Sequence, residues 1–263
     1  MNNEYMPFMS EIKEIIKHTD IEYTFRMTYE GDVKPGQFFE VSIPTFGEAP
    51  ISVSGIGEGT VDLTIRKVGK VTNEIFTNYV GNKLFLRGPY GNGFDVNDYK
   101  GKELTIVAGG TGVAPVRSMI NMFFNDETYT KSVNLICGFK DENSVLFKDE
   151  LALWKEKFEA IYTLDKGEKE GFENGLVTTH LAKLPFEKFG DNYEVIIVGP
   201  PMMMKFTSLE FVKLGVPEEK IYVSFERKMS CAVGKCGHCR VDETYVCLEG
   251  PVFNYTKAKD LLD

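Results

Sequence analysis

Four of the five cysteines of this 263-residue chain lie close together near its C-terminus, in the stretch CAVGKCGHCRVDETYVC. Four residues separate the first two cysteines of this stretch, two separate the next pair, and seven precede the last. The first three positions match the plant-type spacing of [2Fe–2S] proteins, in which a fourth cysteine follows further along the chain. The pattern therefore predicts a [2Fe–2S] cluster held by Cys231, Cys236, Cys239 and Cys247.

The residues between these cysteines are small, as a loop that wraps closely around a cluster requires. Ala232, Gly234 and Gly237 supply this room. Zinc is an alternative, although a zinc ribbon usually brings two Cys-x2-Cys pairs and this stretch has one; uncoordinated thiols are another. His238 is interpreted as an exposed loop residue, because a Rieske centre needs two histidines. Cys137, in the stretch VNLICGF, is predicted to be a buried core residue.

A glycine-rich turn earlier in the chain has the chemistry of a phosphate site. Residues 104–119 read LTIVAGGTGVAPVRSM, which predicts an apolar strand, a turn and a helix with Pro115 in its first turn. Such a turn presents free N–H groups to an anion at the helix N-terminus. We expect a nucleotide phosphate there; the alternative is a turn that only closes a strand–helix unit. The residues concerned are Gly109, Gly110, Thr111 and Gly112.

A second segment of the same kind is VIIVGPPMMM, residues 195–204. Ligands of open α/β sheets bind beyond the carboxyl ends of the strands, so Gly199 and Pro200 are predicted to contact the same nucleotide. The three methionines at 202–204 are predicted to belong to a helix core.

The elements that must position these motifs change character along the chain. From about residue 22 to residue 88, short apolar strands alternate with turns, which predicts a small antiparallel barrel. From about residue 101 to residue 223, apolar strands are followed by helix-length segments, which predicts a doubly wound parallel sheet. The predicted domains are therefore a barrel at 1–99, an α/β domain at 100–224 and a small cluster lobe at 225–263.

Composition excludes several classes of partner. The formal net charge is −9 and the chain has no basic run, so nucleic acid is not expected to bind. No apolar run approaches the roughly 20 residues that cross a bilayer. The start MNNEYMPFMSEIKEI lacks the features of an export signal, which predicts a cytoplasmic protein. Clustered cysteines in that compartment are more often metal ligands or redox groups than disulfides.

Three segments of the barrel zone carry a family resemblance: APISVSG at 49–55, IRKVGKVT at 65–72 and GPYGNGF at 88–94. Together they resemble the ferredoxin–NADP reductase superfamily, in which a barrel binds FAD and the following α/β domain binds a nicotinamide nucleotide. Where that family has Arg-x-Tyr-Ser, this chain has Ala49 followed by Pro-Ile-Ser, and Val198 stands in place of a familiar cysteine. The flavin contacts that the resemblance implies are Pro50, Ile51, Ser52, Ile65, Arg66, Lys67, Gly69 and Thr72.

Arg66 is the candidate for the positive charge that the first flavin segment lacks, because it lies in the strand expected opposite that segment. The alternative for Arg66 is an exposed strand residue without a ligand.

The junction SFERKMSCAVGKCGHC, residues 224–239, narrows the resemblance to electron-transfer subunits with an appended [2Fe–2S] lobe, including the dihydroorotate dehydrogenase type. Within that group, KCGHC, the seven-residue gap before Cys247 and the C-terminal tail are similar to the B subunits of anaerobic sulfite reductase. The resemblance implies that NADH reduces FAD and that electrons leave through the cluster. They would pass to catalytic and iron–sulfur subunits of a sulfite reductase complex, which reduce sulfite to sulfide.

No catalytic acid or base is expected, because the cofactors carry the chemistry. Glu226 is a candidate contact of the nicotinamide. After VNLICGF, residues 140–143 read Lys-Asp-Glu-Asn, where a 2′-phosphate would require arginine and would meet carboxylates, so NADH is predicted over NADPH. Two other functions remain open: an electron-transfer subunit of a dihydroorotate dehydrogenase or hydrogenase, and a zinc-stabilised binding module.

Overall fold

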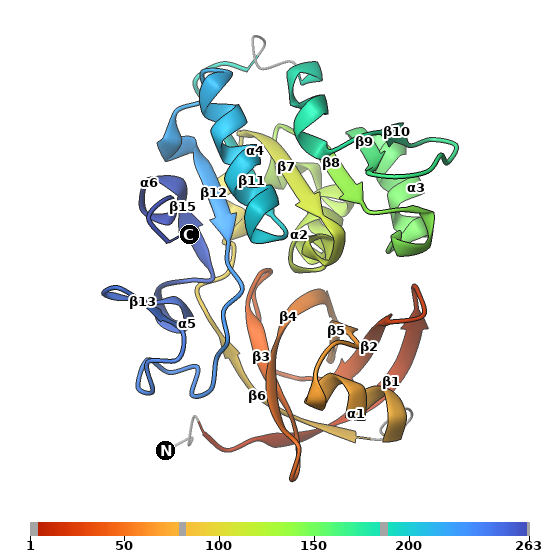
Figure 1. The fold of residues 1–263 in the computed structure, drawn as a ribbon, viewed down its shortest axis with the longest axis vertical. Coiled ribbons are helices and arrows are strands. Elements are labelled where there is room, and N and C mark those ends of the chain that lie inside the picture. Colours follow the sequence, from red (N-terminus) through yellow and green to blue (C-terminus); the bar gives the residue numbers. More distant parts are fainter. Residues whose placement is uncertain (1–4, 79–82, 185–188, 262–263) are drawn as a thin grey trace. The chain divides into compact units, whose positions relative to one another are not determined.

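The computed structural model describes residues 5–78, 83–184 and 189–261. The chain divides into two compact units, each made of two stretches of chain (Figure 1). The first unit contains Met1–Phe94 with Glu226–Val252, and the second contains Asp95–Phe225 with Phe253–Asp263. Within the described ranges, none of the helices has the length and apolar character that crossing a bilayer demands.

The first unit is built on a closed barrel of six strands in the order β1-β2-β5-β4-β3-β6, and all of its neighbouring strands are antiparallel. This confirms the predicted antiparallel barrel. Its elements are β1 (Phe8–Lys17), β2 (Glu22–Thr28), β3 (Phe38–Ile43), β4 (Gly47–Gly57), β5 (Thr60–Arg66), the helix α1 (Lys70–Asn78) and β6 (Lys83–Tyr90).

The barrel interior is filled by side chains that alternate along the strands. Phe25, Met27, Phe39, Leu63 and Leu86 are fully buried in one apolar cluster, to which α1 also contributes. The sequence pattern missed β1, which lies before residue 22, because most of its side chains are exposed and the period-two alternation is hidden. This strand is held by its pairing with β2 and β6 and does not depend on an alternating pattern of its own.

The cluster lobe contains little regular structure. It has a short hairpin of β13 (Arg240–Val241) and β14 (Thr244–Tyr245), followed by one turn of helix, α5 (Val246–Glu249). The contact-based units divide the chain differently from the predicted domains, since residues 253–263 group with the α/β unit. There the Phe253 ring lies 5.7 Å from that of Phe225, measured between centroids.

The second unit contains a seven-stranded sheet in the order β10-β9-β8-β7-β11-β12-β15. Its strands are β7 (Glu103–Gly109), β8 (Ser132–Phe139), β9 (Glu159–Leu164), β10 (Glu173–Asn174), β11 (Tyr193–Val198), β12 (Ile221–Ser224) and β15 (Val252–Asn254). Its α-helices are α2 (Val113–Asn125), α3 (Lys148–Lys157), α4 (Pro201–Lys213) and α6 (Tyr255–Ala258). Short 3₁₀ helices are η1 (Val96–Tyr99), η2 (Gly110–Gly112), η3 (Glu127–Tyr129), η4 (Glu142–Ser144), η5 (Val177–Lys183) and η7 (Glu218–Lys220).

The order of the strands reverses between β7 and β11. From β7 the chain proceeds outward through β8 and β9 on one side, and on the other side through β11 and β12, with parallel pairing throughout. Right-handed crossovers in opposite directions place α4 on the opposite face from α2 and α3. This is the predicted doubly wound sheet, and the reversal defines the switch point at which such sheets bind ligands.

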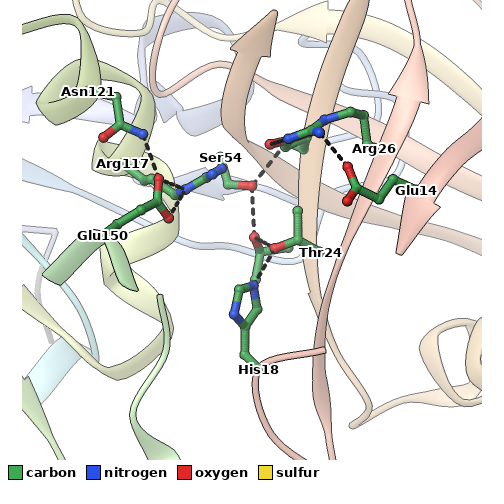
Figure 2. A network of polar contacts seen from close by, with 10 residues as sticks. Glu14, His18, Thr24, Arg26, Ser54, Arg117, Asn121 and Glu150 are labelled. Carbon is green, nitrogen blue, oxygen red and sulfur yellow. Dashed lines mark hydrogen bonds and ion pairs between the residues drawn. The ribbon is translucent and has the colours of Figure 1, made fainter. Parts of the chain in front are cut away.

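A polar network holds α2 against α3 in the second unit (Figure 2). Nε of Arg117 donates to both carboxylate oxygens of Glu150, at 2.9 and 2.7 Å, and Asn121 donates to the same carboxylate at 2.8 Å. Trp154 donates to Asn121 at 2.8 Å, and the Arg117 guanidinium lies 5.0 Å from the ring centroid of Phe147. The helix α2 held by this network directly follows the glycine turn of η2.

One carboxyl group in the barrel wall is buried without a hydrogen bond. Glu40 on β3 is 0% exposed, and among the described residues neither of its carboxylate oxygens has a hydrogen-bonding partner. Burial raises the pKa of Glu40 to about 7; the charge of Arg87 opposes this rise, and Glu48 adds to it. The folded state therefore holds a proton on Glu40 at pH values where the unfolded chain has lost it.

We predict that Glu40→Gln stabilises the protein above pH 7. Because the folded pKa lies above the ordinary value of 4.5, stability should fall as pH rises from about 4.5 to about 7, and the loss should persist at higher pH. A neutral amide of the same shape does not titrate, so the variant keeps the stability that the parent loses. At 1.36 kcal/mol per pKa unit, its free energy of unfolding should exceed that of the parent by up to about 3 kcal/mol above pH 7. Denaturant unfolding of both proteins at pH 5 and pH 8 measures it. The prediction is contradicted if the free energies of unfolding of the two proteins differ by the same amount at pH 5 and at pH 8.

Candidate functional site

The loop that carries the first three clustered cysteines turns its backbone amides toward sulfur. Three N–H groups donate to Sγ of Cys231, those of Val233 at 3.5 Å, Lys235 at 3.3 Å and Cys236 at 3.4 Å. A fourth, from Gly234, donates to Sγ of Cys247 at 3.2 Å. Hydrogen bonds of this kind stabilise a charged sulfur, so the loop is built to hold thiolates.

The electrostatics of the two amide-bonded thiols differ. Burial alone would raise the pKa of Cys231, but the backbone N–H groups outweigh it and lower the pKa to about 7. For Cys247, burial and a hydrogen bond shared with Cys239 raise the pKa to about 12. Cys231 therefore ionises more readily than Cys247.

The loop reaches this shape through left-handed backbone conformations. Ala232, Gly234 and Gly237 have φ values of 58°, 70° and 78°. A Cβ atom at Gly234 would lie 2.2 Å from Cδ1 of Leu248, whereas one at Gly237 would meet nothing within 4 Å. Because Leu248 is 56% exposed and its side chain can move, the left-handed backbone is what favours glycine at both positions.

The spacing of the cysteines, with one Cys-x2-Cys pair, favours a two-iron cluster over a zinc ribbon. A structural zinc site needs four ligands around one point, whereas a [2Fe–2S] cluster distributes its four thiolates over two iron atoms. His238 is exposed and Cys137 is fully buried in β8, as expected for residues outside the cluster.

An arginine that the sequence analysis did not single out anchors the cluster loop to the barrel. The Arg87 guanidinium donates to the main-chain oxygens of Cys231 at 2.8 Å and Ser230 at 2.6 Å. It also donates to the carboxylate of Glu48 at 2.8 Å and the hydroxyl of Tyr90 at 3.0 Å. Arg87 is only 4% exposed. The available signal was a charged residue inside the apolar strand KLFLRGPY.

The first flavin segment, residues 49–52, lies on β4 beside β3. Ile51 pairs with Phe39 and Ser52 with Phe38 in this antiparallel ladder. All four residues of the segment, including Pro50, are half-buried, and Ile51 packs partly against the barrel core. The segment therefore forms a half-buried part of the barrel wall.

The second flavin segment begins on β5, the strand antiparallel to β4. Ile65 is fully buried in the barrel core, so its side chain cannot contact a ligand, and only its backbone is available. Arg66 lies on the expected strand, but its Nε pairs with a carboxylate oxygen of Glu22 at 3.0 Å. Lys67, which follows β5, is exposed.

The end of this segment forms the start of α1. The Oγ1 of Thr72 accepts hydrogen bonds from the N–H groups of Gly69 at 2.8 Å and Val68 at 3.0 Å. Thr72 is buried and therefore shapes the turn at the helix start rather than presenting its hydroxyl to a ligand.

The two glycine turns of the second unit lie side by side at the switch point. Residues 109–112 follow β7, and Gly199 and Pro200 follow β11, whose last residue pairs with Ala108. A Cβ atom on Gly112 would lie 2.4 Å from the backbone oxygen of Val198, so only glycine permits this approach. Gly110 has a φ of 55°, and a Cβ there would meet nothing within 4 Å. The two turns thus form one backbone-lined edge, as ligand binding at this point requires.

The methionines at 202–204 differ from the prediction that all three belong to a helix core. Met204 is 1% exposed and does so, but Met202 is 60% exposed. Met203 lies against the glycine turns: Cβ atoms on Gly109 and Gly199 would be 2.2 and 2.6 Å from its sulfur. The start of α4 therefore packs on the edge where the nucleotide is expected.

The structure also shows the surroundings of Glu226 and of the acidic residues at 141–142. Glu226 is exposed and follows β12 by two residues along the chain. The acidic pair after β8 is already engaged: Asp141 accepts a hydrogen bond from the backbone of Ser144 at 3.0 Å, and Glu142 pairs with Lys169 at 2.6 Å.

Family models match two parts of the chain. Residues 106–209 match the oxidoreductase NAD-binding domain, and residues 226–259 match the iron–sulfur cluster binding domain of dihydroorotate dehydrogenase B. These matches cover the glycine turns and the cysteine loop respectively.

Whole-chain relatives extend the likeness to the barrel. The chain is 35% identical to the gamma subunit of sulfhydrogenase 2 from Pyrococcus furiosus, over 97% of both chains. It is 32% identical to a probable dihydroorotate dehydrogenase B (NAD(+)) electron transfer subunit from Thermoplasma volcanium, over 93% of this chain and 88% of the relative.

Among solved structures, an NADH-dependent reduced ferredoxin–NADP oxidoreductase studied for flavin-based electron bifurcation superposes with a TM-score of 0.80. It is 25% identical in sequence, and the match covers 96% of this chain and 90% of that one. The cofactors of this architecture are FAD, NAD(H) and an iron–sulfur cluster. The chain belongs to the ferredoxin–NADP reductase-like electron-transfer subunits that carry an iron–sulfur domain of the dihydroorotate dehydrogenase B type.

Proposed function

We propose that the protein takes electrons from NADH and delivers them, one at a time, through a [2Fe–2S] cluster to a separate catalytic subunit. The observation that carries this proposal is the loop at 231–239, whose amides point at two cysteine sulfurs on a chain that also has paired glycine turns at a sheet switch point. When bound, FAD converts two-electron hydride chemistry into one-electron transfer, and the cluster carries single electrons. The protein's own part is to bind and orient these groups.

Each predicted binding residue has a task under this proposal. The backbone of residues 109–112, with Gly199 and Pro200, would hold the nicotinamide nucleotide, and Glu226 would contact its ring. The segments at 50–52 and 65–72 would hold FAD through main-chain groups and through Arg66, provided that Arg66 exchanges Glu22 for the flavin phosphates. Cys231, Cys236, Cys239 and Cys247 would hold the cluster. The division into 1–99, 100–224 and 225–263 follows these three cofactors rather than the contact-based units.

The acceptor subunit is the finer part of the proposal. Similarity over nearly the whole chain favours an acceptor of the hydrogenase or dihydroorotate dehydrogenase type, because the relatives carry those names. A sulfite reductase is the second candidate, and KCGHC with the short gap before Cys247 supports it. The cytoplasmic location inferred from the sequence stays a prediction.

We predict that the isolated chain, purified without oxygen, reduces ferricyanide with NADH but forms no sulfide from sulfite. After the four ligands are assigned, Cys137 is the remaining cysteine, and it is fully buried in β8. One thiol cannot hold the additional iron–sulfur cluster that sulfite chemistry implies. Sulfide formation by the isolated chain would contradict the prediction. So would a lack of ferricyanide reduction in protein that contains both FAD and iron.

The acceptor can be identified with the native complex, isolated through a tag on this chain. With NADH as donor, three products are assayed in parallel: sulfide from sulfite, hydrogen from protons, and dihydroorotate from orotate. Hydrogen or dihydroorotate would support the acceptor that the relatives favour. Sulfide would support the second candidate.

We predict that Cys236→Ala loses the cluster and that Cys137→Ala retains it. The first change removes a proposed ligand from an exposed loop position, whereas the second removes a small apolar group from β8. Iron, acid-labile sulfide and the visible spectrum are measured in both variants. Retention of the cluster in Cys236→Ala together with its loss in Cys137→Ala would reverse the assignment.

We predict a higher kcat/KM for NADH than for NADPH with ferricyanide as acceptor. Asp141 and Glu142 follow β8, where the 2′-phosphate of NADPH would meet their negative charge. Lys169 pairs with Glu142 and partly neutralises its charge. Glu142→Gln should therefore reduce the preference for NADH over NADPH by less than Asp141→Asn does. A clear NADPH advantage in the parent protein would end this interpretation.

A further inference from the structure

Arg87 joins the two parts of the first unit between which electrons must pass under the proposed function. On one side its guanidinium donates to the main-chain oxygens of Ser230 and Cys231, where the cluster loop begins. On the other side it pairs with Glu48, the residue directly before the first flavin segment on β4. One side chain on β6 therefore connects the flavin strand with the first proposed cluster ligand.

The geometry of this connection is rigid. A guanidinium is planar, offers five N–H groups in a fixed fork and keeps its charge at any ordinary pH. Arg87 uses the fork in three directions, with bonds of 2.6 to 2.8 Å to Ser230, Cys231 and Glu48. Tyr90 fixes it further, because its hydroxyl accepts from Nη1 at 3.0 Å and its ring centroid lies 5.5 Å from Cζ.

The charge of Arg87 acts on the loop at short range. Its side chain is 5% exposed, so water screens it weakly, and it bonds directly to the carbonyl of a proposed ligand. Two carboxyl groups face it: Glu48, which is paired with it, and Glu40, which is opposite it in the β3–β6 ladder. Reduction adds one negative charge to the cluster, and a positive charge held beside the ligand loop stabilises that state.

We propose that Arg87 is a positioning residue for electron transfer: it fixes the start of the cluster loop to the flavin strand, and its charge raises the reduction potential of the cluster. The inference rests on the proposed function, because it requires a cluster on the four cysteines. It adds a residue that touches no reacting atom and that acts through the backbone of Ser230 and Cys231.

The test compares Arg87→Gln and Arg87→Lys with a matched control, Arg26→Gln. Arg26 is also a barrel arginine bound by carboxylates, those of Asp62 at 2.9 Å and of Glu14, on strands β5 and β1 (Figure 2). Each full-length protein is prepared with its cofactors without oxygen. Its iron and FAD are counted, and the cluster is titrated electrochemically and followed by electron paramagnetic resonance. Iron release to a chelator is timed.

For Arg87→Gln we expect the equilibrium constant for one-electron reduction of the cluster to fall about tenfold. This fall corresponds to a reduction potential that is about 59 mV lower than that of the parent. Arg87→Lys keeps the charge, so its potential should stay near that of the parent. Its iron should be released faster, because a single ammonium group cannot span two carbonyls and Glu48. Arg26→Gln should match the parent in both measurements.

The inference is overturned if Arg87→Gln keeps both the potential and the iron-release rate of the parent, or if Arg26→Gln shifts them equally. If Arg87→Gln binds no iron, Arg87→Lys decides: faster release at the parent potential supports the role, and parent-like release overturns it. Failure of the proposed function would look different, since the parent protein would then lack iron or FAD, or NADH would leave its cluster oxidised.

Discussion

Bringing four cysteine sulfurs together, three from one loop and Cys247 from α5, is the constraint on which the proposed cluster site depends. Negative sulfur needs nearby donors, and in this loop the donors are backbone N–H groups directed at Cys231 and Cys247. The loop turns through left-handed conformations at residues 232, 234 and 237, which explains why these positions carry small residues. The loop itself has almost no regular structure, so its position depends on contacts with the barrel.

Those contacts link the chemistry of the loop to the stability of the barrel. Arg87 is buried in the wall beside Glu40 and Glu48, and it is satisfied partly by carbonyl groups of the loop. A buried guanidinium with a lost partner is costly, so the barrel wall and the loop stabilise each other. The raised pKa of Glu40 has the same origin, because the wall that excludes water from Arg87 also excludes it from this carboxyl.

The nucleotide end follows a different physical rule. There the two glycine turns meet because β7 and β11 are hydrogen-bonded neighbours, and the backbone is left bare because a side chain on Gly112 would collide with Val198. The ion pair between buried Arg117 and half-buried Glu150 holds α2 in place behind the first turn. The nucleotide binding proposed for this end would thus depend on backbone geometry, which many sequences can satisfy.

The sequence by itself determined the features that depend on local spacing. The cysteine pattern and the glycine turns each occupy a few consecutive residues, and the alternation of strands with helices is made of short local patterns. The fold class could therefore be predicted, and the cluster and nucleotide sites could be proposed. Strand β1 was not predicted, because a mostly exposed strand shows no alternation of apolar and polar residues. Only the tertiary structure decided the pairing of Arg66 with Glu22, the burial of Ile65 and the exposure of Met202. It alone revealed Arg87, because 144 residues separate that arginine from Cys231 and no sequence pattern specifies which buried charge meets which distant carbonyl.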